Sequence, residues 1–383
     1  MLNKFDELFE QINKHLDSTY QNWLFGAGVS LQSNIPLMHP MTKKIETELT
    51  GNSSDTFTKM KEFLPGSPHI EHYLSHIGDL IALLDRADIN EITMNGVQYE
   101  YWSLYTLYKD IVRIIGDLVR FGYNESEDKQ GTIYSPIVEI KPHQEFIKKL
   151  FNRRSNLENI TTINFFTTNY DTLLEDALSL EKKEVIDGFT GGAMGFWNPD
   201  EFNGRLNSDT YRVYKLHGSI DWYKDENRGL IRCRYGTKYL SDNSNLLIYP
   251  QATKYVETQK DPFAFLFSKF RDNLNISRDN VLVTCGYSFG DNHINNEIEM
   301  AMSLPNNKTN LLVFIKEPWD DTKNDSSLPS ILLNWLDNSN FKDRVFVLTQ
   351  KGIYNGDSNF YSDSNEGKEF DWWKFEGLTK LLD

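Results

Sequence analysis

The chain has 383 residues, of which 39% are hydrophobic, so it is long enough to bury one large core or two moderate ones. Its net charge of −15 argues against a nucleic-acid-binding surface of its own. No run approaches the ~18 apolar residues of a membrane span, and the N-terminus lacks the apolar core of a secretion signal. Two cysteines give no disulfide framework. We therefore expect a cytoplasmic protein without a membrane segment or direct nucleic-acid binding.

The first predicted elements are a helix over 5–16, whose apolar residues share one face, and a strand at 23–25. This strand runs into the glycine turn Gly26-Ala27-Gly28-Val29-Ser30. Its two glycines allow a sharp turn and a close approach of ligand to backbone, and N–H groups at a following helix start attract anions. The turn predicts a diphosphate site. A strand–helix turn without a ligand remains the alternative, because Leu31 replaces the third glycine of the dinucleotide fingerprint.

Residues 41–154 have helical periodicity, and we interpret them as an inserted helical module. Within it, His69, His72 and His76 share one side of a helix and, with Glu71, raise the question of a metal site. These side chains lie beside the apolar stripe of the same helix, and no further cluster of ligands completes a site. We therefore expect no metal there.

An α/β pattern resumes at 159 and continues to about 350. With the strand at 23–25, it predicts a doubly wound sheet of mostly parallel strands. The expected strands are 161–166, 211–216, 245–249, 281–285, 310–315 and 344–349, and the expected helices are 172–180, 262–274, 292–303 and 329–337. A polar loop over 353–368 then leads to an aromatic-rich helix over 370–382, which docks on the core or on another chain.

Three of the predicted strands end in polar groups, and ligands bind at the carboxyl ends of strands in an open α/β sheet. The first ending is Thr167-Thr168-Asn169-Tyr170-Asp171, and the second is Leu216-His217-Gly218. The third is Gly286-Tyr287-Ser288, followed by Asp291 at the start of a helix. Structural roles are the alternative for each: helix capping for Asp171 and Asp291, turn formation for Asn169, and a hydrogen-bonded strand end for His217.

In this order the motifs resemble the NAD-binding core of sirtuins. The glycine turn with Asn34-Ile35-Pro36 is similar to Gly-Ala-Gly-Ile-Ser with Gly-Ile-Pro-Asp-Phe. The three strand endings are similar to Thr-Gln-Asn-Ile-Asp, His-Gly and Gly-Thr-Ser. The resemblance implies a Rossmann-like sheet in which 1–40 and 155–352 form a discontinuous NAD-binding catalytic core. The inserted module is then 41–154, and 353–383 is a loop and a C-terminal helix at an interface.

The departures from the sirtuin pattern concern zinc and the acyl-lysine loop. Sirtuin deacylases carry two pairs of zinc cysteines after His-Gly, whereas this chain has only Cys233 and Cys285, far apart, so no zinc is expected. Leu37 and Met38 replace Asp-Phe, and His39 stands where that loop has arginine. The remaining pattern resembles bacterial sirtuin-like NADases that act as effectors of antiphage defence.

This resemblance implies an NAD glycohydrolase, with NAD as substrate and with nicotinamide and ADP-ribose as products. By the resemblance, Asn169 holds the ribose and orients water, Asp171 engages the carboxamide of nicotinamide, and His217 is the general base. The residues expected to contact the rest of NAD are Gly26, Ala27, Gly28, Ser30, Pro36, Thr168, Gly286, Ser288 and Asp291.

Control of such an activity is expected from physical necessity, because an unregulated NADase would empty the NAD pool of the cell. We expect a homo-oligomer within a defence complex, and the resemblance implies a HerA-type ATPase or an Argonaute-like protein as partner. Two other functions remain open: an NAD-dependent deacylase or ADP-ribosyltransferase, and a non-catalytic subunit that senses NAD or ADP-ribose.

Overall fold

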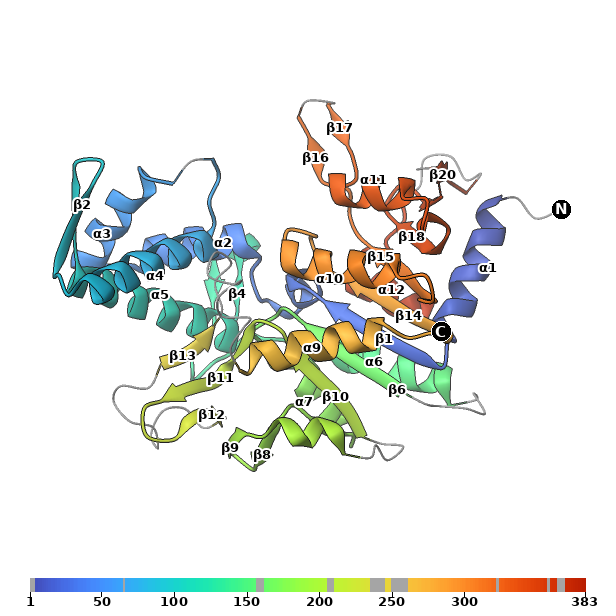
Figure 1. Ribbon diagram of the computed structural model, residues 1–383, viewed down its shortest axis with the longest axis horizontal. Helices are drawn as coiled ribbons and strands as arrows, with labels where there is room; N and C mark the ends of the chain where they lie inside the picture. Colours follow the sequence, from blue (N-terminus) through green and yellow to red (C-terminus); the bar gives the residue numbers. More distant parts are fainter. Residues whose placement is uncertain are drawn as a thin grey trace.

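The computed structural model describes residues 4–64, 66–155, 162–204, 210–234, 245–248, 261–321, 324–356, 359–363 and 369–383. Its centre is a nine-stranded sheet with the order β20-β19-β18-β15-β14-β1-β6-β10-β7 (Figure 1). The strands are β1 (Tyr20–Phe25), β6 (Thr162–Thr167), β7 (Glu184–Ile186), β10 (Thr210–Lys215), β14 (Asn280–Cys285), β15 (Thr309–Phe314), β18 (Val345–Leu348), β19 (Ile353–Asn355) and β20 (Asn359–Tyr361).

All neighbouring strands from β7 to β18 pair in parallel, and only β19 and β20 are antiparallel. The chain builds the sheet outward from β1 through β6 and then crosses to β14, β15 and β18 on the other side. The strand order therefore reverses between β1 and β14, which is the position where open α/β sheets bind ligands. This topology confirms the predicted α/β fold with a doubly wound, mostly parallel sheet.

Helices cover both faces of the sheet, which explains why its strands are nearly continuous apolar runs. Trp23 and Phe25 of β1 pack into one core, whereas Leu24 packs into the other. The first core also contains side chains of α1 (Lys4–Leu16), α6 (Lys141–Arg154), α7 (Leu173–Leu180) and α12 (Phe375–Leu381). The second contains side chains of α9 (Phe263–Leu274), α10 (Asn292–Ser303) and α11 (Ser330–Asp337).

A second, five-stranded antiparallel sheet is built from segments on both sides of β10 in the chain and was not predicted from the sequence. Its strands are β8 (Phe189–Gly191), β9 (Met194–Trp197), β11 (Gly218–Asp225), β12 (Gly229–Cys233) and β13 (Asn245–Ile248). The strand expected at 245–249 thus joins this sheet as β13 instead of the main one. Short strands such as β8 and β9 carry too few residues for a readable alternation.

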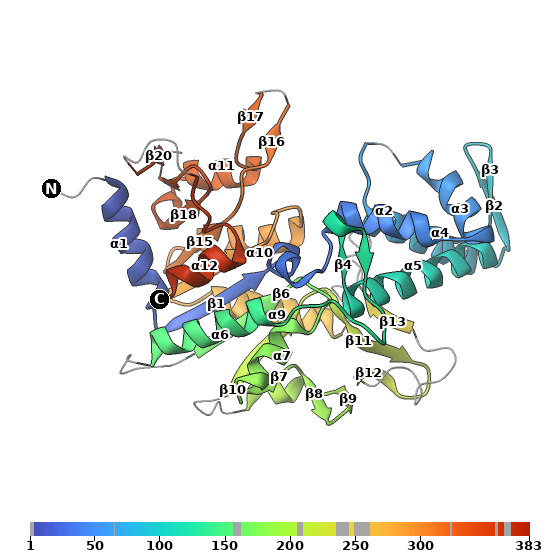
Figure 2. The same cartoon turned by 180° about the vertical axis from the view of Figure 1, so that it is seen from behind.

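The helical module lies to one side of the sheet and has its own core (Figure 2). It contains α2 (Met38–Glu48), α3 (Gly51–Lys61), α4 (Ile70–Ala87), the hairpin β2 (Glu91–Met94) and β3 (Val97–Glu100), α5 (Tyr101–Phe121), and the hairpin β4 (Tyr123–Asn124) and β5 (Lys129–Gln130). Helix α6, which falls within the predicted range 41–154, packs instead on the sheet through Phe146, Ile147 and Leu150.

The C-terminal segment packs against the chain itself. Trp372 and Phe375 are buried, with ring centroids 6.2 Å from Phe5 and 5.7 Å from Phe25, respectively. β19 and β20 lie within 353–368, which the sequence predicted as a loop. A role of 353–383 at an interface with another chain remains a prediction, and only the exposed side chains of this segment are available for it. None of the helices in the described ranges combines the length and the apolar character that a bilayer crossing requires.

Candidate active site at the carboxyl ends of the strands

The glycine turn after β1 packs directly against the loop after β14. The N–H of Gly26 donates to the Cys285 carbonyl at 3.1 Å, and the N–H of Gly28 donates to the Gly286 carbonyl at 3.0 Å. A Cβ atom on Gly28 would lie 2.7 Å from Cα of Gly286, and Gly286 itself has a φ of +66°. Glycine is therefore required here for contact between the two loops, in addition to any role in ligand approach.

Ser30 joins this turn to the polar ending of β6. Its Oγ donates to Oδ2 of Asp171 at 2.8 Å and accepts from Nδ2 of Asn169 at 3.0 Å. Oδ1 of Asp171 accepts the backbone N–H of Leu173 at 3.1 Å, but the N-cap of α7 is Thr172, so Asp171 lies one residue before the expected capping position. Oδ1 of Asn169 is buried and accepts no hydrogen bond from the described residues. An amide oxygen in this state is an acceptor that fits a ligand hydroxyl.

His217 lies at the turn between β10 and β11, beside the end of β6. The preceding N–H, that of Leu216, donates to the Thr167 carbonyl at 2.8 Å. Nε2 of His217 lies 2.9 Å from Oδ2 of Asp291, and both side chains are buried. Oδ1 of Asp291 accepts the His293 N–H at 3.0 Å, so Asp291 caps α10 as the structural alternative predicted.

The remaining predicted contact residues are Thr168, Ala27, Pro36 and Ser288, and they differ in exposure. Thr168 and Ala27 are partly exposed, and the Thr168 N–H donates to the Phe25 carbonyl at 3.0 Å. Pro36 is buried between η1 (Ala27–Ser33) and α2, and Ser288 is exposed in the loop after β14.

Sequence reasoning missed a buried ion pair beneath the Asn169 loop. Nζ of Lys215 lies 3.3 Å from Oε1 of Glu175 and also donates to the Asp171 carbonyl. Burial raises the pKa of Glu175 to about 7, while the ammonium of Lys215 acts in the opposite direction. The sequence held one signal for this ion pair, a lysine near the end of the expected strand 211–216, because a lysine in a buried strand requires a partner.

Tyr170 links the same loop to the helical module, which the sequence also did not predict. Its hydroxyl donates to Oε1 of Glu71 in α4 at 2.7 Å, and its carbonyl accepts the Ile220 N–H at 2.9 Å. Burial, together with the nearby carboxylate of Glu71, raises the pKa of Tyr170 well above its usual range. The hydroxyl therefore stays protonated and remains a donor.

His143 of α6 is a further buried group near this cluster. Its Nδ1 lies 3.3 Å from Oγ of Ser33, at the end of η1. Burial lowers the pKa of His143 to about 4, although the carboxylate of Asp171 acts in the opposite direction. The ring is therefore neutral near pH 7.

The three histidines at and near the start of α4 make ring contacts. The rings of His69 and His72 lie 4.0 Å apart at the start of the helix, and His76 stacks on Phe63 at 4.9 Å. Across the part of the chain that the structure describes, no group of three or more histidine, cysteine or acidic side chains is arranged to hold a metal ion.

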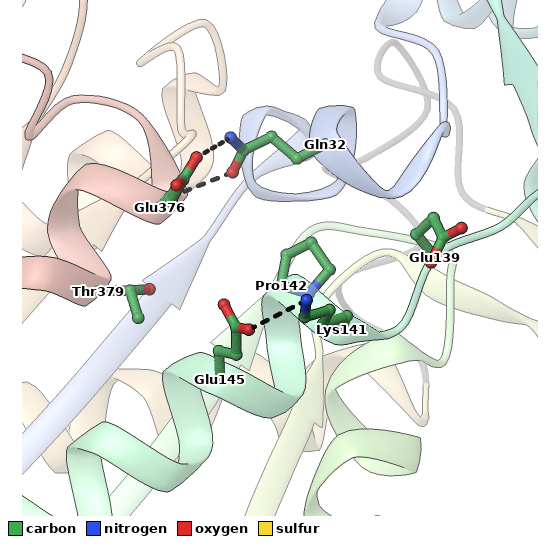
Figure 3. Close-up of a pocket in the computed structure, with 7 residues that line it drawn as sticks. All are labelled: Gln32, Glu139, Lys141, Pro142, Glu145, Glu376 and Thr379. Atoms are coloured by element: carbon green, nitrogen blue, oxygen red, sulfur yellow. Dashed lines mark hydrogen bonds and ion pairs between the residues drawn. The ribbon is translucent and has the colours of Figure 1, made fainter.

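A surface pocket of about 320 Å³ lies between η1, α6 and α12 (Figure 3). Its lining residues are Gln32, Glu139, Lys141, Pro142, Glu145, Glu376 and Thr379. They include none of the predicted site residues, and three carboxylates against one ammonium give this pocket a negative charge that suits a dinucleotide poorly.

Known proteins resemble this chain at low identity, and no curated protein matches it. Among solved structures, a mutant Sir2 homologue with 2′-O-acetyl ADP-ribose shares 12% identity over 85% of this chain and 90% of its own, with a TM-score of 0.36. A Sir2 homologue in complex with NAD shares 10% identity over 81% and 82%, with a TM-score of 0.38. A family model described as a SIR2-like domain matches residues 163–341, so the sirtuin resemblance is confirmed for that part of the chain, which contains Asn169, His217 and Asp291.

Proposed function

We propose that the chain is an NAD glycohydrolase that cleaves NAD to nicotinamide and ADP-ribose. The observation that supports this most directly is the position of Asn169, Asp171 and His217 at the carboxyl ends of adjacent parallel strands, within a SIR2-like domain. Amide, carboxylate and imidazole groups are the kinds needed to hold a sugar, bind a carboxamide and accept a proton.

In this proposal Asn169 holds the ribose, because its buried Oδ1 is an acceptor without a partner among the described residues. Asp171 receives the carboxamide N–H of nicotinamide, since a carboxylate that already accepts from Ser30 and Leu173 retains further lone pairs. The loops that carry Gly28 and Gly286 lie on the diphosphate side.

His217 accepts the proton of the attacking water. The water oxygen bonds to the anomeric carbon of the ribose, and the carbon–nitrogen bond breaks with its electron pair leaving on neutral nicotinamide. The water proton passes to the imidazole of His217 and then to solvent. A histidine is suited to this step, because its ordinary pKa of ~6.5 lies close to neutral pH.

Control by assembly or by a partner forms part of the proposal, with NAD depletion in the cytoplasm during abortive infection as its outcome. The support is the module beside the site, whose Trp102 side chain is 69% exposed and stacks edge to face on Tyr105 at 5.9 Å. An exposed tryptophan beside a second aromatic ring is typical of interface residues. We infer a homo-oligomer that works with a defence partner, a HerA-type ATPase or an Argonaute-like protein.

The test is NAD consumption by the purified protein, alone and together with the products of neighbouring genes. We expect nicotinamide and ADP-ribose in equal amounts, with or without a metal chelator, and strongly reduced product formation by the Asn169→Ala variant. Activity that a chelator abolishes and zinc restores contradicts the assignment. NAD binding without turnover under every condition favours the sensor subunit, and turnover only with an acyl-lysine peptide favours the deacylase.

A further inference from the structure

Asp291 connects two structural elements through its two carboxylate oxygens. Oδ1 accepts the backbone N–H of His293 at 3.0 Å and so caps α10. Oδ2 lies 2.9 Å from Nε2 of His217. The two side chains are 5% and 4% exposed, so bulk water screens their interaction little.

We propose that Asp291 is the positioning residue that fixes the orientation and protonation of His217. This inference rests on the proposed function, in which His217 accepts a proton. An ionised carboxylate only accepts hydrogen bonds, so the ring nitrogen that faces it, Nε2, carries a proton. The lone pair of the neutral ring is then on Nδ1, and the carboxylate stabilises the imidazolium that forms when Nδ1 takes the proton of water.

The start of α10 holds this carboxylate in place. The Tyr287 hydroxyl donates to the Asp291 carbonyl at 3.1 Å and lies 2.9 Å from Oδ1 of Asn295. Nδ2 of Asn295 donates in turn to the Phe289 carbonyl at 2.8 Å. Because the backbone of Asp291 and its Oδ1 are both bonded, Oδ2 remains aimed at the imidazole.

The substitution Asp291→Asn changes the contact with His217 but keeps the N-cap of α10. Asparagine caps helices as well as aspartate does, so its single oxygen stays on the His293 N–H. The amide NH₂ group then faces Nε2 of His217 and donates to it, which moves the ring proton to Nδ1. The variant therefore keeps its fold and inverts the tautomer of one histidine.

Nitrogen-15 NMR of histidine-labelled protein measures the tautomer directly, with a His217→Gln variant to assign the signal. We expect a proton on Nε2 in the unsubstituted protein and on Nδ1 in Asp291→Asn. NADase turnover should fall by roughly 10²–10⁴, the range for a disabled general base, with little change in KM and in melting temperature. Asp55→Asn, at an exposed position of α3, removes the same charge and should change neither measurement.

The NMR measurement needs no turnover, so the inference and the proposed function fail separately. A proton that stays on Nε2 in Asp291→Asn, or full turnover by that variant, overturns the role of Asp291. An inverted tautomer in a protein that never hydrolyses NAD leaves the role of Asp291 in place and rejects the glycohydrolase.

Discussion

The two ends of strands β1, β6 and β14 both carry buried polar side chains, but of different kinds. At the amino ends, Nδ2 of Asn22 donates to Oδ1 of Asn280 at 2.9 Å, and Nδ2 of Asn164 donates to Oδ1 of Asn22 at 3.0 Å. Nδ2 of Asn164 also lies 2.8 Å from Oδ1 of Asn273 in α9. These groups are neutral amides. At the carboxyl ends, the ionisable groups Asp171, after β6, and Asp291, after β14, lie in turns beyond the strands, together with His217 after the neighbouring strand β10.

The comparison shows which features distinguish a site from a structural network. Each end has one buried amide oxygen with no hydrogen bond from the described residues, Oδ1 of Asn164 and Oδ1 of Asn169. Such an oxygen alone does not mark a site. The carboxyl ends differ because a carboxylate and an imidazole converge there beside loops in close backbone contact. We therefore expect substitutions at the carboxyl ends to change turnover and those at the amino ends to change stability.

The largest expected effects are losses of turnover, and the first of these is the loss in His217→Ala. Removing a general base should lower NADase turnover by roughly 10²–10⁴ while NAD still binds. Chromatography of the products measures the rate, and calorimetric titration measures the affinity. Full turnover by this variant would mean that another group accepts the proton.

The same change at opposite ends of β6 tests the comparison most directly. Asn164→Ala removes the donor to Oδ1 of Asn22 and to Oδ1 of Asn273, and each loss should cost ~1–3 kcal/mol of the free energy of unfolding. Asn169→Ala loses one bond to Ser30 and should reduce turnover at least as much as His217→Ala, because ribose positioning is also lost. Urea unfolding and NAD hydrolysis measure the two properties, and equal effects of both variants on both properties would contradict the distinction.

Part of the dependence of stability on pH should come from side chains near the carboxyl ends, because the amino-end amides of Asn22, Asn164 and Asn280 do not titrate. Burial lowers the pKa of His143 from 6.5 to about 4, so between these values only the unfolded chain binds the proton. The free energy of unfolding should therefore fall as the pH decreases from 6.5 to 4, by at most ~1.4 kcal/mol per pH unit from this group.

His143→Gln should reduce this slope, and urea unfolding at several pH values measures it. Glu175 works in the opposite direction over 4.5 to about 7, because burial raises its pKa in the folded protein. Its contribution to stability falls as the pH rises through that window, so Glu175→Gln in the same experiment separates the two groups. If the free energy of unfolding of His143→Gln falls between pH 6.5 and 4 as steeply as that of the unsubstituted protein, the decrease does not come from His143.

The motifs predicted the sheet and the position of the site because both depend on local sequence. Apolar runs that end in Gly26, Asn169, His217 and Gly286 identify strands and their carboxyl ends without knowledge of the partners. The partners of these side chains depend on tertiary packing. The distance from Lys215 to Glu175, or from Asp291 to His217, follows from helix and strand placement, which single-sequence periodicity does not contain.

The smallest expected effect concerns the bond between Tyr170 and Glu71, which joins the carboxyl-end loop to the helical module. Tyr170→Phe removes this bond, and a loss of ~1 kcal/mol in positioning corresponds to about a fivefold lower turnover. Glu71→Gln keeps an acceptor for the tyrosine hydroxyl and should retain most of the activity. Steady-state kinetics distinguish the two variants, and their melting temperatures measure the stability that each has lost. Equal turnover in both variants would show that the module does not act on Asn169 through this contact. Any control by the module would then reach the site through another contact, such as the hydrogen bond from Arg120 to the Ile220 carbonyl.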